Sequence, residues 1–387
     1  MAKGLVLAGG GARGSYQVGA YQALLELGWA PGVIVGTSVG CLNGALFVQD
    51  AWEQARDMWL AIDDSQVMAA PPAPETAGAR EKAAFLAEVV RQGGMDVSPL
   101  ERIVRLCLDE AAVRRAPIRY GLVTVQQKTL RARELAIEEI PEGMLADHML
   151  ASAACFPAFQ PRQIGEERFI DGGYADNMPT GLAARLGADE LLCVDVDGVG
   201  IVRPNTTGLP TRILSSHWDL GPILRFSPKT AARNIELGYL DAYRLFGRVL
   251  GIGYAVRPEE GEALAARFLP PYGACMARAI RANPALALTE RRALEHFAPG
   301  QGEDTVFAPL ELACETVGTD PARLYRADEL CEAFLAGYEP ERAARFAPLF
   351  GPQARGRLVE CGMAAAEPAE FVAAAVYTAL TAQDDAG

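Results

Sequence analysis

A serine lies between two glycines near the start of the chain, in the segment Gly36-Thr37-Ser38-Val39-Gly40. An apolar, strand-like run precedes this segment, and a helix-like run of small residues follows it. The pattern predicts a strand, a sharp turn and a helix, with Ser38 at the turn, where its hydroxyl stands clear of the sheet. Gly36 and Gly40 allow the close backbone approach that such a turn requires. A serine held in this way could act as a nucleophile in acyl transfer.

Two further glycine-containing segments could supply the rest of that chemistry. The run Gly9-Gly10-Gly11-Ala12-Arg13-Gly14 follows a short apolar strand and precedes a helix-like stretch. Backbone N–H groups and the positive end of the helix dipole would therefore point at one place and could stabilise an oxyanion. All six residues are candidates for that role, with Gly10 and Gly11 foremost. Asp171-Gly172-Gly173 follows another apolar run, and its glycines would let the carboxylate approach a neighbouring loop.

In their order along the chain, these three segments resemble the signatures of the patatin-like phospholipase family. Those signatures are a glycine-rich oxyanion loop, a G-x-S-x-G nucleophile turn and a D-G-G or D-G-A base. The resemblance continues through Ala151–Phe159 and Asp176–Pro179 and covers roughly residues 1–250. It implies a three-layer α/β/α fold and hydrolysis of fatty acyl esters, with Ser38 as nucleophile and Asp171 as general base. The motif position of Arg13 suggests that it organises the loop or meets a substrate phosphate.

Each motif also has an alternative interpretation. Gly9, Gly11 and Gly14 satisfy the dinucleotide-binding pattern G-x-G-x-x-G. The acidic residue that such a site needs about 20 residues further on is missing, because the chain there reads Pro31–Gly36. The serine of the second motif could simply cap the following helix, and the aspartate of the third could belong to an ordinary Asp-Gly turn. The joint presence of the three motifs favours the catalytic interpretation.

The histidines bear on the mechanism, because an ordinary serine hydrolase uses one as its base. His148 precedes Asp171 in a helix-like stretch, and neither His217 nor His296 lies in a glycine-rich loop after a strand. We therefore expect a dyad in which Ser38 donates a hydrogen bond directly to Asp171, which takes the proton during attack and returns it to the leaving group. A carboxylate can do this only in a site dry enough to raise its pKa.

Short apolar runs alternate with helix-like runs over the first half of the chain. Strands are predicted at 4–8, 33–36, 120–125, 167–170 and 190–196, and helices at 15–27, 39–48, 99–110, 145–154 and 178–186. This alternation predicts an α/β fold, with a mostly parallel sheet sandwiched by helices. Ligands bind such sheets beyond the carboxyl ends of the strands, where all three motifs are expected to lie.

The chain changes character after about residue 250. Residues 259–382 are rich in alanine, leucine and arginine and are interrupted by prolines, which predicts a bundle of short helices. Two of these helices would begin at Asp320-Pro321 and Glu367-Pro368, with proline in the first turn. The helix-like run Phe371–Leu380 could be an interface helix, but packing in a core is the commoner explanation.

We therefore expect two domains, a patatin-like catalytic domain over residues 1–250 and a helical C-terminal region of unknown role over residues 251–387. Within the first, residues 66–92 begin with a stretch rich in proline and alanine and continue into a helix-like stretch. They could form a lid over an acyl groove. A solvent-exposed loop followed by a surface helix is the simpler interpretation.

The composition argues against several classes of protein. The 387 residues include 49 acidic and 36 basic ones, and the net charge of −13 disfavours binding to nucleic acid or to anionic lipid through a polybasic patch. The eight cysteines are scattered and indicate free thiols in a reducing compartment. No run of about 18 apolar residues occurs and the first residues leave no room for a signal peptide, so we expect a cytoplasmic location. A protein exported without a cleaved signal would look the same.

These features together predict a lipid acyl hydrolase that cleaves fatty acyl esters of phospholipids or lysophospholipids through an acyl-Ser38 intermediate. We expect no cofactor and no metal, since Asp195 and Asp197 could hold a divalent ion but such acids more often cap loops. The expected partner is a lipid or acyl-ester substrate, with peripheral membrane contact that is apolar or local. The alternative is a weakly active or inactive protein that uses the same fold to bind lipid or a protein partner.

Overall fold

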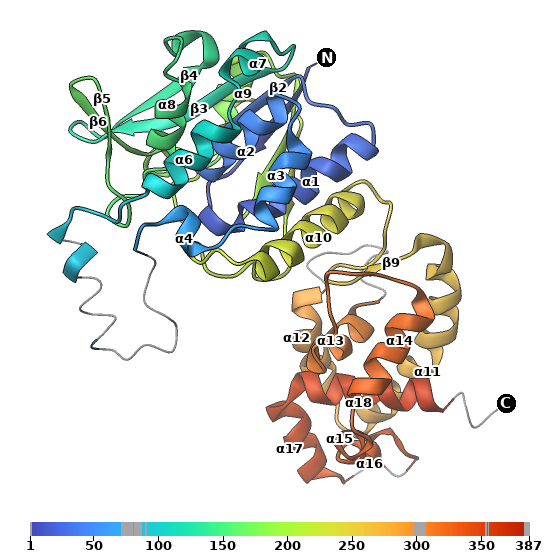
Figure 1. Ribbon diagram of the computed structural model, residues 1–387. Helices are drawn as coiled ribbons and strands as arrows, with labels where there is room; N and C mark the ends of the chain where they lie inside the picture. The colour runs from blue at the N-terminus through green and yellow to red at the C-terminus, as the bar shows by residue number, and fades with distance from the viewer. Residues whose placement is uncertain are drawn as a thin grey trace. The chain divides into compact units, whose positions relative to one another are not determined.

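The computed structural model describes residues 2–70, 80, 87–89, 91–297, 307–352, 354 and 356–382 (Figure 1). The chain divides into two compact units, Met1–Ala242 and Tyr243–Gly387. Most of the segment 66–92, for which a lid was considered, lies outside the described residues.

The first unit is built on an eight-stranded sheet with the strand order β5-β6-β3-β2-β1-β7-β8, to which β4 is added by pairing with β3. Its strands are β1 (Lys3–Leu7), β2 (Val33–Thr37), β3 (Arg119–Gln126), β4 (Arg131–Ala136), β5 (Arg162–Ile164), β6 (Glu167–Asp171), β7 (Glu190–Asp195) and β8 (Thr211–Ser215). The pairs β1–β2, β2–β3, β1–β7 and β7–β8 are parallel, whereas β3 pairs antiparallel with β4 and β6, and β5 with β6.

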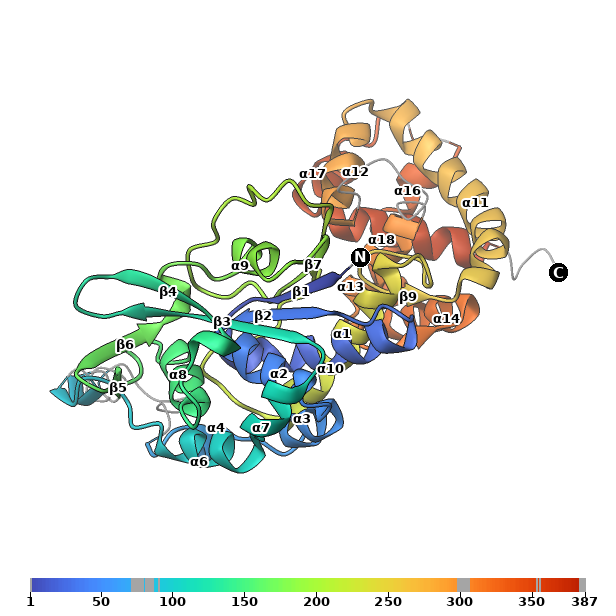
Figure 2. The same cartoon turned by 90° about the horizontal axis from the view of Figure 1, so that it is seen from above.

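Helices cover both faces of this sheet. Helices α2 (Val39–Val48) and α8 (Leu145–Ser152) pack on one face, and α9 (Thr180–Arg185) packs on the other (Figure 2). The other described helices of this unit are α1 (Ser15–Glu26), α3 (Trp52–Trp59), α4 (Asp64–Val67), α6 (Ser98–Cys107), α7 (Glu110–Arg115) and α10 (Pro228–Leu245), and the residues of α10 after Ala242 belong to the second unit. The central strands are buried along almost their whole length, as expected for strands covered on both faces. The predicted α/β architecture is confirmed.

The second unit is mainly helical. Its described helices are α11 (Gly261–Ala282), α12 (Leu286–Leu294), α13 (Ala308–Thr316), α14 (Ala327–Gly337), α15 (Pro340–Ala344), α16 (Ala347–Phe350), α17 (Leu358–Ala366) and α18 (Pro368–Thr381). Two short strands, β9 (Ala255–Val256) and β10 (Leu324–Tyr325), pair in parallel. The run Phe371–Val376 of α18 is fully buried against α11, α12, α13 and α15, so core packing explains this apolar helix.

Two predictions for this unit are wrong. Helix α11 is not short: it runs through Pro270 and Pro271, which lack the N–H groups that would bond the carbonyls one turn earlier, at the exposed residues Ala266 and Arg267. Asp320 does not begin a helix; its carboxylate accepts a hydrogen bond from the N–H of Ala322 at 3.0 Å in a turn before β10. Pro368 does begin a helix, as predicted.

A buried glutamate ties two segments of the second unit together. Glu311 of α13 is fully buried, and its Oε1 accepts hydrogen bonds from the N–H groups of Ile252, Gly253 and Tyr254 at 2.7, 2.8 and 2.9 Å. Three amides of one loop thus meet one carboxylate oxygen, while the other oxygen of Glu311 has no partner among the described residues.

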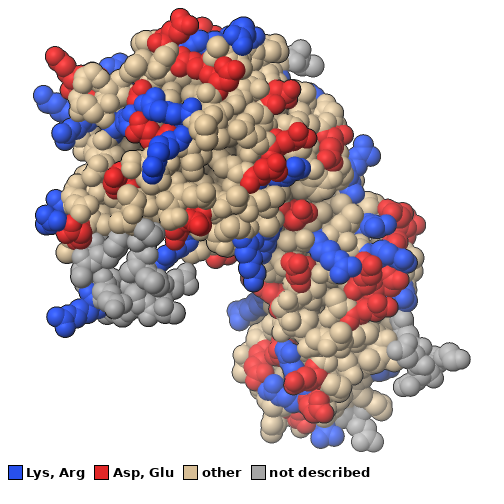
Figure 3. Space-filling model, viewed as in Figure 1, with Lys and Arg blue, Asp and Glu red and all other residues tan. Residues whose placement is uncertain are grey.

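The surface carries both signs of charge. Acidic and basic side chains are interspersed over the face shown in Figure 3. Within the part of the chain that the structure describes, every helix is too short or too polar to cross a bilayer. All eight cysteines are free thiols.

Candidate active site

Ser38 lies at the turn between β2 and α2. Its backbone has a φ of 54° and a ψ of −126°, a conformation that costs a residue other than glycine roughly 1–3 kcal/mol. Its N–H donates a hydrogen bond to the hydroxyl of Ser152 at 2.9 Å, and that hydroxyl donates to the Val123 carbonyl at 2.6 Å. Residues of α8 and β3 thus hold the strained turn in place.

Glycines let the elements around this turn approach one another. A Cβ atom on Gly40 would lie 2.2 Å from the Leu7 carbonyl oxygen, and one on Gly36 would lie 2.3 Å from the Gly40 carbonyl carbon. Neither position has room for a side chain. This contact seats the first turn of α2 on the end of β1, which brings Ser38 close to the loop that follows β1.

The register of three neighbouring strands brings Asp171 to Ser38. The residue before the serine pairs with Val123, and the next residue of β3, Thr124, pairs with Asp171. The Ser38 hydroxyl acts on the Asp171 carboxylate and lowers its pKa, and the N–H of Gly173 donates a hydrogen bond to the same carboxylate at 2.8 Å. This arrangement differs from the expected one. Because β6 runs antiparallel to β3, Asp171 does not lie at the end of a parallel strand.

The Asp171 carboxylate is held out of water. Asp171 is only 6% exposed. The next residue, Gly172, lets the chain lie so close to β3 that a Cβ atom on it would be 2.2 Å from the Val123 carbonyl oxygen. Desolvation raises the pKa of Asp171 from 3.8 to about 6, although the hydrogen bonds from Ser38 and Gly173 oppose the shift. At neutral pH the carboxylate is ionised and is a stronger base than an ordinary aspartate.

The glycine loop, residues 9–14, lies beside the serine. A Cβ atom on Gly9 would be 3.0 Å from the Cβ of Ser38. The N–H of Gly9 donates to the Asn177 carbonyl at 3.3 Å, and the Asn177 side-chain amide donates back to the Gly9 carbonyl at 3.1 Å. At the other end of the loop Gly14 packs on Val39 of α2.

Some amides of this loop are already engaged. The N–H of Ala12 donates to the Ile223 carbonyl at 2.7 Å, and the N–H of Arg13 donates to the Gly10 carbonyl at 3.2 Å. Among the described residues, the N–H groups of Gly10 and Gly11 have no such acceptor. These two amides are therefore the ones in the loop that are free to bind an oxyanion.

The guanidinium of Arg13 binds two other loops. It donates to the Gly221 carbonyl at 2.6 Å and forms ion pairs with Asp197 at 3.2 Å and Asp219 at 3.4 Å. The Asp195 carboxylate accepts the N–H of Asp197 at 2.9 Å, so these acids close a turn. Across the described residues no three His, Cys, Asp or Glu side chains form a metal-binding group. Arg13 thus joins the glycine loop to the loops after β7 and before α10.

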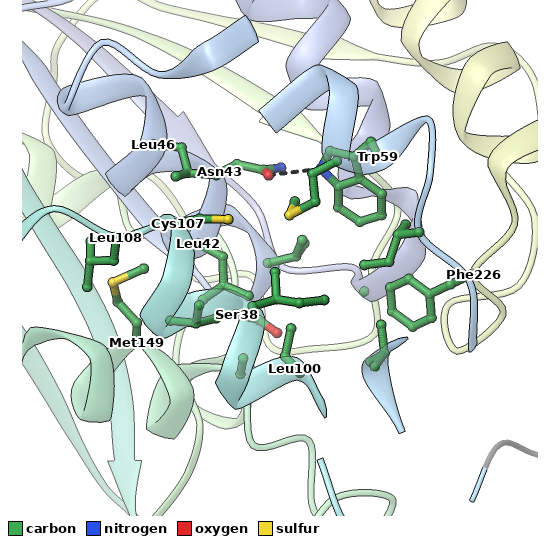
Figure 4. A pocket seen from close by; sticks show the side chains of 18 of the residues that line it. Ser38, Leu42, Asn43, Leu46, Trp59, Leu100, Cys107, Leu108, Met149 and Phe226 are labelled. Carbon is green, nitrogen blue, oxygen red and sulfur yellow. Dashed lines mark hydrogen bonds between the residues drawn. The ribbon is translucent and has the colours of Figure 1, made fainter. Parts of the chain in front are cut away.

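An apolar pocket opens beside Ser38 (Figure 4). Its walls come mainly from α2, α3, α6 and α8. The lining residues are Gly11, Ser38, Val39, Leu42, Asn43, Leu46, Met58, Trp59, Ile62, Val67, Leu100, Ile103, Val104, Cys107, Leu108, Met149, Ala153, Phe159 and Phe226. The ring N–H of Trp59 donates to Asn43 at 3.1 Å, so these two polar groups satisfy each other. The space that remains beside the Ser38 hydroxyl suits an acyl chain.

No histidine is among the described residues that line this pocket. His148 lies in α8, where its Nδ1 is 2.9 Å from the Met144 carbonyl oxygen. The ring of His217 packs edge-on against Trp218, and His296 belongs to a short 3₁₀ turn of the second unit.

Two residues that contact the site were not singled out from the sequence. Ser152 holds the Ser38 amide, and Asn177 holds Gly9. Each lies in a segment through which the family resemblance continues, Ala151–Phe159 or Asp176–Pro179. For Ser152 the available signal was a single polar residue within a run of small ones, whereas Asn177 follows another polar residue, Asp176, and has no such signal.

Residues 5–184 match the family model described as patatin-like phospholipase. An uncharacterized NTE family protein of Mycobacterium tuberculosis is 26% identical over 226 residues, which are 55% of this chain and 35% of that protein. Lysophospholipase NTE1 of Coccidioides immitis is 27% identical over 244 residues, 60% of this chain and 13% of that protein. The matched part thus spans about a third or less of these relatives.

Two solved structures are also similar to the chain. VipD from Legionella pneumophila has a TM-score of 0.41 and 15% identity, with 98% of this chain and 90% of that chain covered. The type III effector protein ExoU has a TM-score of 0.34 and 15% identity, with 98% and 88% covered. Residues 5–184 form a patatin-like phospholipase domain.

Proposed function

We propose that this chain is a lipid acyl hydrolase that cleaves fatty acyl esters of phospholipids or lysophospholipids, with Ser38 as nucleophile and Asp171 as general base. The observation that carries the proposal is the placement of Ser38 in the lining of an apolar pocket, with the buried Asp171 carboxylate brought next to it by the strand register. The matched family and a relative named lysophospholipase support the substrate class.

The reaction begins when Ser38 Oγ attacks the ester carbonyl carbon while Asp171 takes the hydroxyl proton. The carbonyl oxygen becomes an oxyanion and accepts hydrogen bonds from the Gly10 and Gly11 amides. Collapse of this intermediate breaks the ester bond, and the leaving oxygen takes the proton from Asp171, so that an alcohol departs and Ser38 stays acylated. Water then attacks the acyl carbonyl with Asp171 again as base, and the proton passes to Ser38 Oγ as the fatty acid leaves.

Burial of the base is what makes this scheme work without a histidine. An aspartate with its usual pKa would be too weak a base for an alcohol, whereas desolvation raises the pKa of Asp171 to about 6. The acyl chain would lie in the pocket lined by α2, α3, α6 and α8, and no cofactor takes part in any step.

A fluorophosphonate probe tests the proposal without a choice of substrate. We expect covalent labelling at Ser38, mapped by peptide mass spectrometry, and no labelling of Ser38→Ala. The Asp171→Asn variant should react at least about 100-fold more slowly, because general-base catalysis contributes that much or more. His217→Ala and His296→Ala are matched controls and should react at nearly the wild-type rate.

Two results would contradict the proposal. A folded protein that is not labelled at Ser38 would favour the alternative of a weakly active or inactive protein that binds lipid or a partner. A large loss of labelling in either histidine variant, with unchanged circular dichroism, would replace the dyad with a triad.

A further inference from the structure

The loop after β7 exposes apolar side chains. In this loop, which we call the rim loop (residues 198–202), Val199 is 87% exposed, Ile201 56% and Val202 51%. Tyr174, in the turn after the base, is 44% exposed. Single exposed apolar residues are common on protein surfaces, but four large ones from two adjoining loops are a different case.

The rim loop is fixed directly to the loops that carry the catalytic groups. The N–H of Ile201 donates to the Gly173 carbonyl at 2.8 Å, and the Ile201 carbonyl accepts the N–H of Asn177 at 2.7 Å. A Cβ atom on Gly198 would lie 1.8 Å from the Gly9 carbonyl oxygen, so the rim loop also lies against the glycine loop. The rim loop therefore lies against the loops that carry the proposed base and the proposed oxyanion amides.

Charge does not explain this surface. The Asp197 side chain that precedes the rim loop is paired with Arg13 at 3.2 Å, and Arg203, which follows it, is paired with Glu134 at 3.4 Å. The loop therefore brings no surplus of positive charge, and the whole chain carries a net charge of −13. Attraction to anionic headgroups would need the opposite balance.

A long-chain ester is sparingly soluble and resides in aggregates, so an enzyme that hydrolyses it must bring its catalytic loops to the surface of the aggregate. Apolar side chains that enter the region between headgroups and acyl chains gain free energy in proportion to the buried area. We propose that the rim loop and Tyr174 insert into the surface of a zwitterionic lipid aggregate, from which acyl esters pass to Ser38. The inference rests on the proposed function for its substrate, but membrane contact can be measured without catalysis.

The first experiment measures binding in the inactive Ser38→Ala background by co-sedimentation with phosphatidylcholine vesicles. Val199→Ser with Val202→Ser should weaken binding about tenfold or more, since two apolar side chains no longer insert. The matched control is Leu358→Ser with Val359→Ser, two residues of the second unit that are 81% and 74% exposed. The affinity of this control for the vesicles should lie within about twofold of that of its parent. The proposal would be overturned if control and rim-loop variant lost affinity equally, or if neither lost affinity.

A second arm separates this inference from the proposed function. In the otherwise wild-type chain the rim-loop variant should hydrolyse a monomeric short-chain ester at nearly the normal rate and vesicle phosphatidylcholine about tenfold more slowly. If the wild-type chain hydrolyses neither ester, the proposed function fails while the binding experiment still decides the inference. Stronger binding when phosphatidylserine replaces part of the phosphatidylcholine would indicate electrostatic adsorption and contradict insertion.

Discussion

At Asp171 two effects act on the pKa in opposite directions. Hydrogen bonds from the Ser38 hydroxyl and the Gly173 amide favour the ionised carboxylate, while burial favours the neutral acid, and burial is the larger effect. The result is a carboxylate that is ionised at neutral pH and accepts a proton more readily than an exposed aspartate does.

The pH profile of hydrolysis tests the role proposed for this residue. Because the pKa of Asp171 is raised to about 6, the ionised base disappears below that pH. We expect kcat/KM for a monomeric ester to be level above about pH 7 and to fall about tenfold per pH unit below about pH 6, with one ionisation in the free enzyme. A profile that stays level down to pH 5 would contradict general-base catalysis by this carboxylate.

The sequence could indicate the motif residues but not all of their supports. Ser38 and Asp171 lie in patterns whose residue types and spacing are informative. The contact of Ser152 with the Ser38 amide and that of Asn177 with Gly9 join segments 114 and 168 residues apart. Such contacts depend on how strands and helices pack, and no local pattern encodes them.

Among the elements, α2 determines where Ser38 lies. Its first turn can sit on the end of β1 only because residue 40 has no side chain, since a Cβ there would be 2.2 Å from a backbone oxygen. Backbone atoms cannot move aside as the end of a flexible side chain can.

Alanine substitutions at two helical glycines test this seating. Gly40→Ala should lower the free energy of unfolding of the first unit by about 3 kcal/mol, because the added methyl overpacks a rigid contact. Gly181→Ala in α9 is the matched control: nothing lies within 4 Å of its added Cβ, so stability should rise by about 0.5–1 kcal/mol. Urea unfolding followed by tryptophan fluorescence measures both, because all four tryptophans lie in this unit. Equal effects of the two changes would contradict the argument.

Four of the five predicted strands are buried along most of their length, and the fifth, β6, is buried only in its second half. The runs that became β1, β2, β3 and β7 are apolar because helices or loops cover both their faces. The missed strands β4, β5 and β8 are short or arginine-containing and half exposed, so their composition resembles that of loops. The antiparallel direction of β6 was also unreadable, since direction depends on the connection and not on the strand's own residues.

For the whole molecule, a buried carboxylate makes the stability of the second unit depend on pH. Desolvation raises the pKa of Glu311 from 4.5 to about 7, against three backbone hydrogen bonds and the charge of Arg244. In the unfolded chain an exposed glutamate has a pKa of about 4.3. Between about pH 4.5 and 7 the folded unit therefore holds a proton that the unfolded chain has lost, and its unfolding free energy falls as the pH rises.

The size of this effect can be measured. Through the Glu311 linkage alone, the unfolding free energy of the second unit should be about 3 kcal/mol lower at pH 8 than at pH 4.5. Glu311→Gln keeps a side-chain oxygen for the three amides and should remove most of this dependence. Urea titrations followed by far-ultraviolet circular dichroism report on both units, and tryptophan fluorescence identifies the first. The same pH dependence in wild type and variant would assign it to other groups.

The backbone of Ser38 has a consequence for natural selection. A folded domain is stable by only about 5–15 kcal/mol, so the roughly 1–3 kcal/mol stored at this single residue is a sizeable share. Glycine at position 38 would relax the turn and yield a more stable protein that lacks the hydroxyl on which the proposed mechanism depends. Under the proposed function, serine in so unfavourable a conformation trades stability for reactivity, and variants selected only for thermal resistance should tend to lose the hydroxyl.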